Sequence, residues 1–305
     1  MSRIYDALER ANLERQAAQE TDAAEIAEPF VASGAEELPP VKDDVILEEI
    51  ASHPWNPSAA SLPTLGDRGE SIEQFRGLRT QIYQARDQAP LKTILVSSGV
   101  PAEGKTFVAS NLAMSLARNK SNRVLLIDAD MRRPALHSIL GAPNVPGLAE
   151  YLAGDAEVND ILQRNQNPRI VEAGRVRNIP DLTFIAAGTG VENFLELVAN
   201  HRIEELIAAL SPHFDWILID TPPVLVFADA IDLARAADAV LLVARAATTP
   251  YDAAQRAQAA FSSSRILGFV LNAVKDAPHR GSYYYYGRRE ESRGPKGPKD
   301  KRRQG

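Results

Sequence analysis

The segment at residues 99–106 constrains the fold more than any other part of this sequence. It reads Gly-Val-Pro-Ala-Glu-Gly-Lys-Thr and matches the pattern G-x-x-x-x-G-K-[ST]. An apolar run at 92–98, expected to be a strand, precedes it, and an expected helix over 105–118 follows it. In that context the backbone N–H groups of the loop and of the helix N-terminus form a nest for phosphate groups. The segment therefore predicts an α/β domain that binds a nucleoside triphosphate, rather than a plain glycine-containing turn.

The side chains of this loop have separate expected roles. Lys105 can reach the β- and γ-phosphates, and the Thr106 hydroxyl can ligate Mg²⁺. ATP and Mg²⁺ are therefore the expected cofactors. The residues expected to line the nucleotide are Gly99, Ala102, Glu103, Gly104, Lys105, Thr106 and Phe107.

Two further apolar runs end in carboxylates. Residues 125–130 read Leu-Leu-Ile-Asp-Ala-Asp, and residues 217–223 read Ile-Leu-Ile-Asp-Thr-Pro-Pro. Strands of a parallel sheet bring such ends to one edge, where ligands bind, although each aspartate taken alone could simply terminate a strand. We expect Asp220 to hold Mg²⁺ through water, together with Thr106, while Asp128 and Asp130 add a second carboxylate pair on the γ-phosphate side. Lys105, Asp128, Asp130 and Asp220 are the expected catalytic residues, because acids beyond the metal ligand suggest a base for an attacking hydroxyl.

The remaining pattern predicts a doubly wound, mostly parallel sheet over residues 66–277. Apolar, β-branched runs alternate with amphipathic stretches, which is typical of strand and helix units around such a sheet. The expected strands are 92–98, 123–128, 182–186, 216–220, 239–244 and 266–271, and the expected helices are 71–86, 105–118, 193–210 and 250–262.

The flanking segments read differently. Residues 1–20 predict an amphipathic helix, and the acidic, proline-containing stretch 21–65 predicts a disordered linker. Residues 278–305 predict a disordered basic tail, in which nine basic and three acidic side chains from Arg280 onward give a charge of +6. That tail holds half of the eight tyrosines, at Tyr283, Tyr284, Tyr285 and Tyr286. A cluster of this kind predicts either phosphate acceptors or an exposed interaction patch.

Composition excludes several classes of function. The chain has no cysteine, which excludes thiolate zinc sites, iron–sulfur clusters and cysteine-dependent phosphatases. Its net charge of −6 argues against general nucleic-acid binding. With no apolar N-terminal run and no stretch of about 18 apolar residues, it is expected to be cytoplasmic.

Taken in order along the chain, five features resemble the bacterial tyrosine kinases of the capsular and exopolysaccharide type. They are the spacing Glu73-x-x-Arg76-x-x-Arg79, the phosphate loop, the segment 126–134, Asp220 with its Thr-Pro-Pro, and the tyrosine cluster. The resemblance covers about residues 72–286, and the opening residues 1–8 are also similar to members that lack a fused membrane domain.

The resemblance implies an ATP-dependent kinase that phosphorylates its own C-terminal tyrosines between subunits of a ring-like oligomer. Asp128 is then the base toward the tyrosine hydroxyl, and Asp130 and Asp220 serve the metal. Glu73, Arg76 and Arg79 contact the neighbouring subunit. Asn272 lies where related P-loop ATPases contact the nucleotide base. The implied partners are protein tyrosine substrates and a membrane polysaccharide co-polymerase, or chain-length regulator, which activates the kinase and places it at the inner face of the plasma membrane.

The sequence differs from the family pattern at two places, and two alternative functions remain open. Ala102 lies where relatives commonly have glycine, and residues 188–193 lack the proline that relatives often carry there. The first alternative is a positioning ATPase of the Min/Par type, whose loops carry a signature lysine at the position of Val100. The second is a nucleotide-binding regulator of polysaccharide export without kinase activity.

Overall fold

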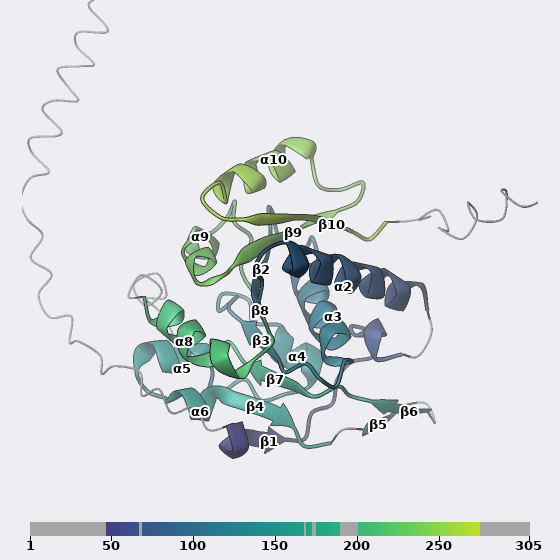
Figure 1. The fold of residues 1–305 in the computed structure, drawn as a ribbon, viewed down its shortest axis with the longest axis vertical. Coiled ribbons are helices and arrows are strands. Elements are labelled where there is room, and N and C mark those ends of the chain that lie inside the picture. The colour runs from purple at the N-terminus through teal and green to yellow at the C-terminus, as the bar shows by residue number, and fades with distance from the viewer. Residues whose placement is uncertain (1–46, 67–68, 168, 173–174, 190–200, 275–305) are drawn as a thin grey trace, which may run out of the picture. The chain divides into compact units, whose positions relative to one another are not determined.

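The computed structural model describes residues 47–66, 69–167, 169–172, 175–189 and 201–274 (Figure 1). The described residues all belong to one compact unit. The predicted N-terminal helix, most of the predicted linker and the tyrosine tail lie outside the described residues, as does the start of the predicted helix 193–210.

An eight-stranded sheet forms the centre of this unit. Its strand order is β1-β4-β7-β3-β8-β2-β9-β10, and neighbouring strands are parallel except for β4 and β7. In that order the strands are β1 (Ala51–His53), β4 (Leu162–Asn165), β7 (Leu182–Ile185), β3 (Val124–Asp128), β8 (Trp216–Asp220), β2 (Thr93–Ser98), β9 (Ala239–Arg245) and β10 (Ile266–Asn272). All six predicted strands are present, which confirms the doubly wound, mostly parallel fold.

Helices cover both faces of the sheet (Figure 1). On one face lie α2 (Glu70–Gln88), α3 (Lys105–Ala117) and α4 (Leu136–Leu140), and on the other α5 (Leu148–Ala153), α6 (Val158–Ile161), α8 (Arg202–Leu210), α9 (Asp229–Leu233) and α10 (Tyr251–Ala260). Short 3-10 turns occur at Leu47–Glu49, Pro63–Leu65, Ser211–His213 and Ala234–Ala236, and β5 (Arg169–Glu172) pairs with β6 (Arg175–Asn178) as a separate antiparallel hairpin.

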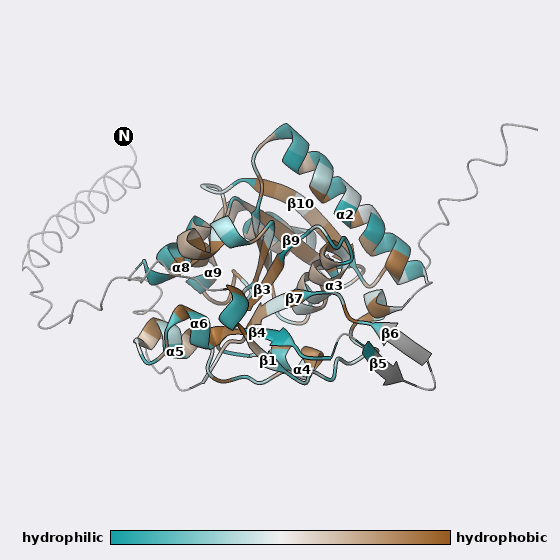
Figure 2. Ribbon diagram, turned by 60° about the horizontal axis from the view of Figure 1, so that its bottom comes forward, coloured by the Kyte–Doolittle hydropathy of each residue, from teal (hydrophilic) through white to brown (hydrophobic). Residues whose placement is uncertain are grey.

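Each central strand supplies both hydrophobic cores. In β3, for example, Leu125 and Ile127 enter the core under α8 and α9, while Val124 and Leu126 enter the core under α2 and α3. A strand buried on both faces reads as a continuous apolar run, which is why the strands were recognisable in the sequence. Figure 2 shows the result, with apolar central strands and a largely polar outer surface on α2.

The prediction that residues 21–65 form a disordered linker is wrong for residues 47–65. This stretch contains β1, which pairs with β4, and its side chains Trp55, Leu62 and Leu65 are buried. Trp55 packs edge-on against Phe184 of β7, with ring centroids 6.0 Å apart. The apolar residues here follow neither the helix nor the strand period and lie among acids and prolines, so the pattern predicted a linker although the stretch completes the core.

We therefore expect Trp55→Ala to lower the free energy of unfolding by about 3–5 kcal/mol, because it removes a large buried ring and leaves a cavity. Urea unfolding followed by far-UV circular dichroism measures this change. Ser52→Ala, at an exposed position of the same segment, is the matched control and should leave the midpoint nearly unchanged. Equal midpoints for both variants would contradict a structural role for this segment.

Candidate functional site

The phosphate loop joins β2 to α3, and left-handed backbone gives it its curvature. Ala102 and Gly104 have φ angles of 65° and 93°. Glycine is required at 104 because an added Cβ would collide with the side-chain amide of Asn272. Ala102 has a left-handed φ angle, which glycine adopts more easily than alanine. This accounts for the glycine that relatives commonly have at this position.

Hydrogen bonds within the phosphate loop and to the ends of neighbouring strands hold the loop in place. The Glu103 carboxylate accepts a hydrogen bond from the backbone N–H of Val100 at 2.9 Å and another from the Thr249 hydroxyl. Asn272 Nδ2 donates to the backbone oxygen of Glu103 at 2.9 Å. Glu103 therefore braces the loop with its side chain turned inward, and Asn272 lies beside the loop at the end of β10.

Lys105, the first residue of α3, lies among carboxylates at the sheet edge. Its Nζ is 2.6 Å from Asp130 Oδ2, 3.7 Å from Asp220 Oδ1 and 3.2 Å from Thr106 Oγ1. Burial by itself lowers the pKa of Lys105, but the charges of Asp220, Asp130 and Asp128 together outweigh it and raise the pKa. The ammonium group is therefore charged and is the main compensation for a buried acidic cluster.

Asp128 and Asp220 face each other across the register of β3 and β8. Burial, reinforced by the charge of Asp220, raises the pKa of Asp128 to about 7, although three backbone N–H groups donate to this carboxylate, from Asp130, Ala135 and Leu136. Burial likewise raises the pKa of Asp220 to about 6, opposed by Lys105. The charges of Asp128 and Asp220 repel each other, and a bound cation would relieve this repulsion.

The donors around Asp220 fit Mg²⁺. Both carboxylate oxygens of Asp220 are buried and have no hydrogen-bond partner among the described residues. The described residues contain no cluster of three or more His, Cys, Asp or Glu side chains that would enclose a metal alone. Mg²⁺ usually takes one or two carboxylates together with phosphate oxygens and water, so Asp220, Asp130 and the Thr106 hydroxyl suit it.

Comparisons with known proteins agree with this geometry. A family model described as "AAA domain" matches residues 92–255. The tyrosine-protein kinase YwqD of Bacillus subtilis is 32% identical over 220 residues, which cover 72% of this chain and 87% of YwqD. The chain belongs to the bacterial tyrosine-kinase family. Among solved structures, the kinase domain of the Escherichia coli tyrosine kinase ETK matches with a TM-score of 0.61 at 30% identity, over 69% of this chain and 78% of that domain.

Other members of the tyrosine-kinase family are much longer than the matched region. EpsB of Ralstonia solanacearum is 35% identical over 215 residues, which cover 70% of this chain but only 27% of EpsB. The chain thus spans about a quarter of the length of such relatives. In this chain, no helix among the described residues is long and apolar enough to cross a membrane.

The predicted subunit-contact residues lie on α2, away from the phosphate loop. Arg76 Nη1 pairs with Glu73 Oε1 at 2.8 Å on the exposed face of the helix, while Arg79 donates to the backbone oxygen of Ser115 on α3 at 2.6 Å. The tyrosines predicted to be phosphate acceptors lie outside the described residues. The loop at Gly188 approaches α5, where Thr189 donates to Glu150, and residues 190–193 of the segment that lacks the proline are outside the described residues.

One ion pair beside the aspartates at the sheet edge was not predicted. Arg132, two residues after Asp130, pairs with the buried Asp229 through Nε and Oδ2 at 2.8 Å, and its guanidinium lies 4.4 Å from the ring centroid of Phe227. These contacts tie the Asp128–Arg132 loop to the loop that follows Asp220. The partners are 97 residues apart, so no local pattern in the sequence could join them.

We expect Arg132→Ala to lower the free energy of unfolding by about 2–4 kcal/mol, because Asp229 is then left buried without its charged partner. Arg133→Ala removes the same charge from an exposed neighbour and should change stability by less than about 0.5 kcal/mol. Thermal unfolding of both variants makes the comparison. A similar effect in both would mean that the pair with Asp229 contributes little.

Proposed function

We propose that the chain is an ATP-dependent protein-tyrosine kinase that phosphorylates Tyr283–Tyr286 of neighbouring copies and thereby regulates exopolysaccharide or capsule synthesis and export. The observation that carries the proposal is the buried cluster at the phosphate loop, where Lys105 lies 2.6 Å from Asp130 and 3.7 Å from Asp220. Membership of the bacterial tyrosine-kinase family supports the reaction class, and the terminal tyrosines provide acceptors.

The residues of the cluster have different proposed roles in the reaction. The backbone N–H groups of the loop and Lys105 bind the phosphates, while Thr106, Asp130 and Asp220 hold the metal. Mg²⁺ supplies neutralisation of the phosphate charge. The tyrosine hydroxyl oxygen attacks the γ-phosphorus of ATP, the bond to the β-phosphate oxygen breaks, ADP leaves, and the hydroxyl proton passes to Asp128. A carboxylate with a pKa near 7 accepts this proton more readily than an ordinary one, although positioning and charge neutralisation supply most of the rate.

Lys105 pairs with Asp130, with Nζ 2.6 Å from Oδ2. To reach a γ-phosphate, Lys105 exchanges Asp130 for a phosphate oxygen, which leaves the Asp130 carboxylate available to the metal. Binding of nucleotide and of metal are therefore expected to support each other at this site.

Oligomer assembly completes the proposal. The Arg76–Glu73 pair and Arg79 on α2 would contact a neighbouring subunit, and the basic tail would occupy that neighbour's active site. Four phosphates at about −1.5 to −2 each add about −6 to −8, enough to cancel or invert the tail charge of +6. Phosphorylation should then release the tail and dissociate the oligomer. The proposed activator of the kinase is a membrane polysaccharide co-polymerase. An unchanged mass by light scattering after full phosphorylation would contradict this step.

Two other functions share the same fold. A Min/Par-type positioning ATPase hydrolyses ATP without transferring phosphate to protein, and Val100 stands where such proteins have a lysine. A regulator without kinase activity would need no complete set of Lys105, Asp128 and Asp220. Both alternatives predict no gain of phosphate by the protein.

Intact mass spectrometry tests the proposal. The protein is incubated with ATP and Mg²⁺, with and without the cytosolic segment of the activator, beside Asp220→Asn and a variant with Tyr283–Tyr286 changed to Phe. Gains in steps of one phosphate, absent in both variants, are expected. Hydrolysis of ATP with no mass gain under any condition would overturn the proposal in favour of the positioning ATPase.

A further inference from the structure

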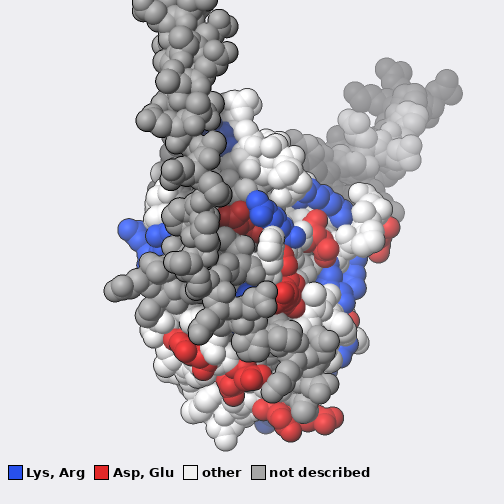
Figure 3. Space-filling view, turned by 90° about the vertical axis from the view of Figure 1, so that its left-hand side faces the viewer, with Lys and Arg blue, Asp and Glu red and all other residues white. Residues whose placement is uncertain are grey.

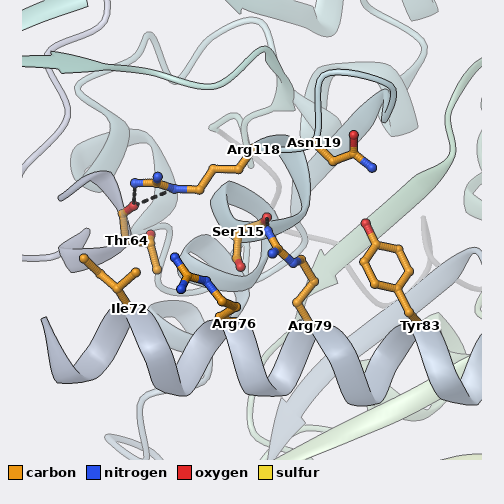
Figure 4. Close-up of a pocket in the computed structure, with 8 residues that line it drawn as sticks. All are labelled: Thr64, Ile72, Arg76, Arg79, Tyr83, Ser115, Arg118 and Asn119. Atoms are coloured by element: carbon orange, nitrogen blue, oxygen red, sulfur yellow. Dashed lines mark hydrogen bonds between the residues drawn. The ribbon is translucent and has the colours of Figure 1, made fainter. Parts of the chain in front are cut away.

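A cavity of about 340 Å³ lies between α2 and the C-terminal end of α3, remote from the phosphate loop. Figure 4 shows Arg76 and Arg79 rising from α2 toward it, with Arg118 extending across its far side. The lining residues are Thr64, Ile72, Arg76, Arg79, Tyr83, Ser115, Arg118 and Asn119. Three of these eight are arginines and none is acidic, whereas acidic and basic side chains lie interspersed on the face shown in Figure 3.

Backbone carbonyls position two of the three arginines, Arg79 and Arg118, so that they present ordered donors. Arg79 gives one hydrogen bond to the Ser115 oxygen at 2.6 Å, and Arg118 bonds to the oxygens of Thr64 and Gly66. A guanidinium has five N–H donors in a planar fork, so the hydrogen bond from Arg79 to the Ser115 oxygen uses only part of its capacity. Positive groups gathered in one cavity repel each other, and an anion that accepts bidentate bonds relieves this repulsion.

The apolar and aromatic side chains of the lining favour an anion that carries an aromatic ring. Ile72 is buried, and Tyr83 presents a ring that is fixed by packing on Trp216 at 5.5 Å and by a hydrogen bond from Asn122. A phosphate on a phenyl ring meets both requirements, because its oxygens match the guanidinium forks and its ring can lie against Ile72 and Tyr83. The chain carries four such acceptors in its tail, and Tyr283 is nine residues beyond Val274, a reach of at most about 30 Å.

We propose that this cavity is a phosphotyrosine site for the C-terminal tail of the same protein. The site also bears on assembly, a consequence that rests on the proposed function. Arg76 holds both carboxylate oxygens of Glu73, at 2.8 and 3.1 Å. A phosphotyrosine in the cavity competes with Glu73 for Arg76 and so withdraws a residue from the proposed subunit contact. Phosphorylation thereby acts on the interface directly, in addition to releasing the tail from an active site.

The test uses a fluorescent peptide of residues 280–289 with one phosphate on Tyr284, and the full chain carrying Asp220→Asn and phenylalanine at positions 283–286, so that the protein adds no phosphate of its own. By fluorescence anisotropy we expect the phosphopeptide to bind at least tenfold more tightly than the unphosphorylated peptide or a peptide with Glu at position 284. Phenyl phosphate should displace it at lower concentration than inorganic phosphate. Equal binding of the three peptides, or equal displacement by the two phosphates, overturns the proposal.

Matched variants place the peptide in the cavity. Arg79→Ala and Arg79→Lys should weaken phosphopeptide binding at least tenfold and severalfold respectively, while Arg256→Ala, on exposed α10, should leave it unchanged. Glu73→Gln should tighten binding severalfold because it releases Arg76. Glu70→Gln removes the same charge one turn earlier on α2 and should have little effect. Equal effects of the two glutamate variants, or binding that survives both Arg79 variants, would exclude this cavity.

Failure of this site can be distinguished from failure of the proposed function. The peptide is synthetic, so its binding does not depend on whether the chain is a kinase. A protein that gains phosphate by mass but does not bind the peptide is a kinase without this site. For the assembly step, phosphopeptide should lower the oligomer mass of the otherwise wild-type protein by light scattering, and an unchanged mass with peptide bound overturns that step.

Discussion

Lys105→Met is expected to abolish autophosphorylation and also to lower the free energy of unfolding by about 3–5 kcal/mol at pH 8. The loss of activity follows from the position of Nζ, which is the cation of the loop and lies on α3 where the phosphates bind. A change on the order of 10²–10³-fold or more is typical when a charge-stabilising group of this kind is removed. The loss of stability follows because Asp130, Asp220 and Asp128 are then buried without their common counterion.

Two comparisons separate these effects. Asp220→Asn should be equally inactive but at least as stable as the wild type, since it removes one charge from the acidic side of the cluster. At pH 5.5 the destabilisation by Lys105→Met should shrink, because the buried carboxyls then bind protons. Urea unfolding at the two pH values measures both trends. If Lys105→Met and the wild type unfold at the same urea concentration at pH 8, the carboxylates do not depend on Lys105.

This expectation affects how an inactive control is chosen. A lysine variant that fails to phosphorylate could be partly unfolded, whereas Asp220→Asn keeps the counterion in place. For the mass experiment, Asp220→Asn is therefore the better control.

The sequence predicted those parts of the fold and site that follow local patterns. The loop at 99–106, the acids at the ends of β3 and β8, and the six strands all depend on residues that are adjacent in the chain. The convergence of Lys105, Asp130 and Asp220 followed because parallel strands present their carboxyl ends at one edge. These features were predictable because buried parallel strands and phosphate loops each impose a continuous residue pattern.

The remaining features depend on contacts between distant segments. The pairing of β1 with β4, the burial of Trp55 against Phe184, and the Arg132–Asp229 pair leave no periodic signal in either partner. The inward turn of the Glu103 side chain toward Thr249 is of the same kind. The cavity between α2 and α3 could not be predicted from the sequence either. The spacing of Arg76 and Arg79 places both on one helix face, but it does not show that Ser115 and Arg118 lie opposite them.

The acidic cluster should make the nucleotide-free protein more stable as the pH falls from 8 to 5.5. Burial raises the pKa of Asp128 to about 7 and that of Asp220 to about 6, well above the usual range of a carboxyl. The native state therefore binds protons more tightly than the unfolded chain does, and stability is gained as the pH falls through the folded-state pKa values. Between pH 8 and 5.5 we expect a gain of about 2 kcal/mol from these two groups.

Asp128→Asn should remove most of this pH dependence, because it deletes the carboxyl with the higher pKa. The variant should be more stable than the wild type at pH 8 and about equal to it at pH 5.5, in EDTA and without nucleotide. Asp252→Asn, on the exposed face of α10, controls for the general loss of one negative charge and should follow the wild type at both pH values. If the wild type and Asp128→Asn depend on pH in the same way, Asp128 is charged in the folded protein over this whole range. In that case Lys105 and the three backbone N–H groups stabilise its carboxylate more than burial destabilises it, and its role as proton acceptor is correspondingly weaker.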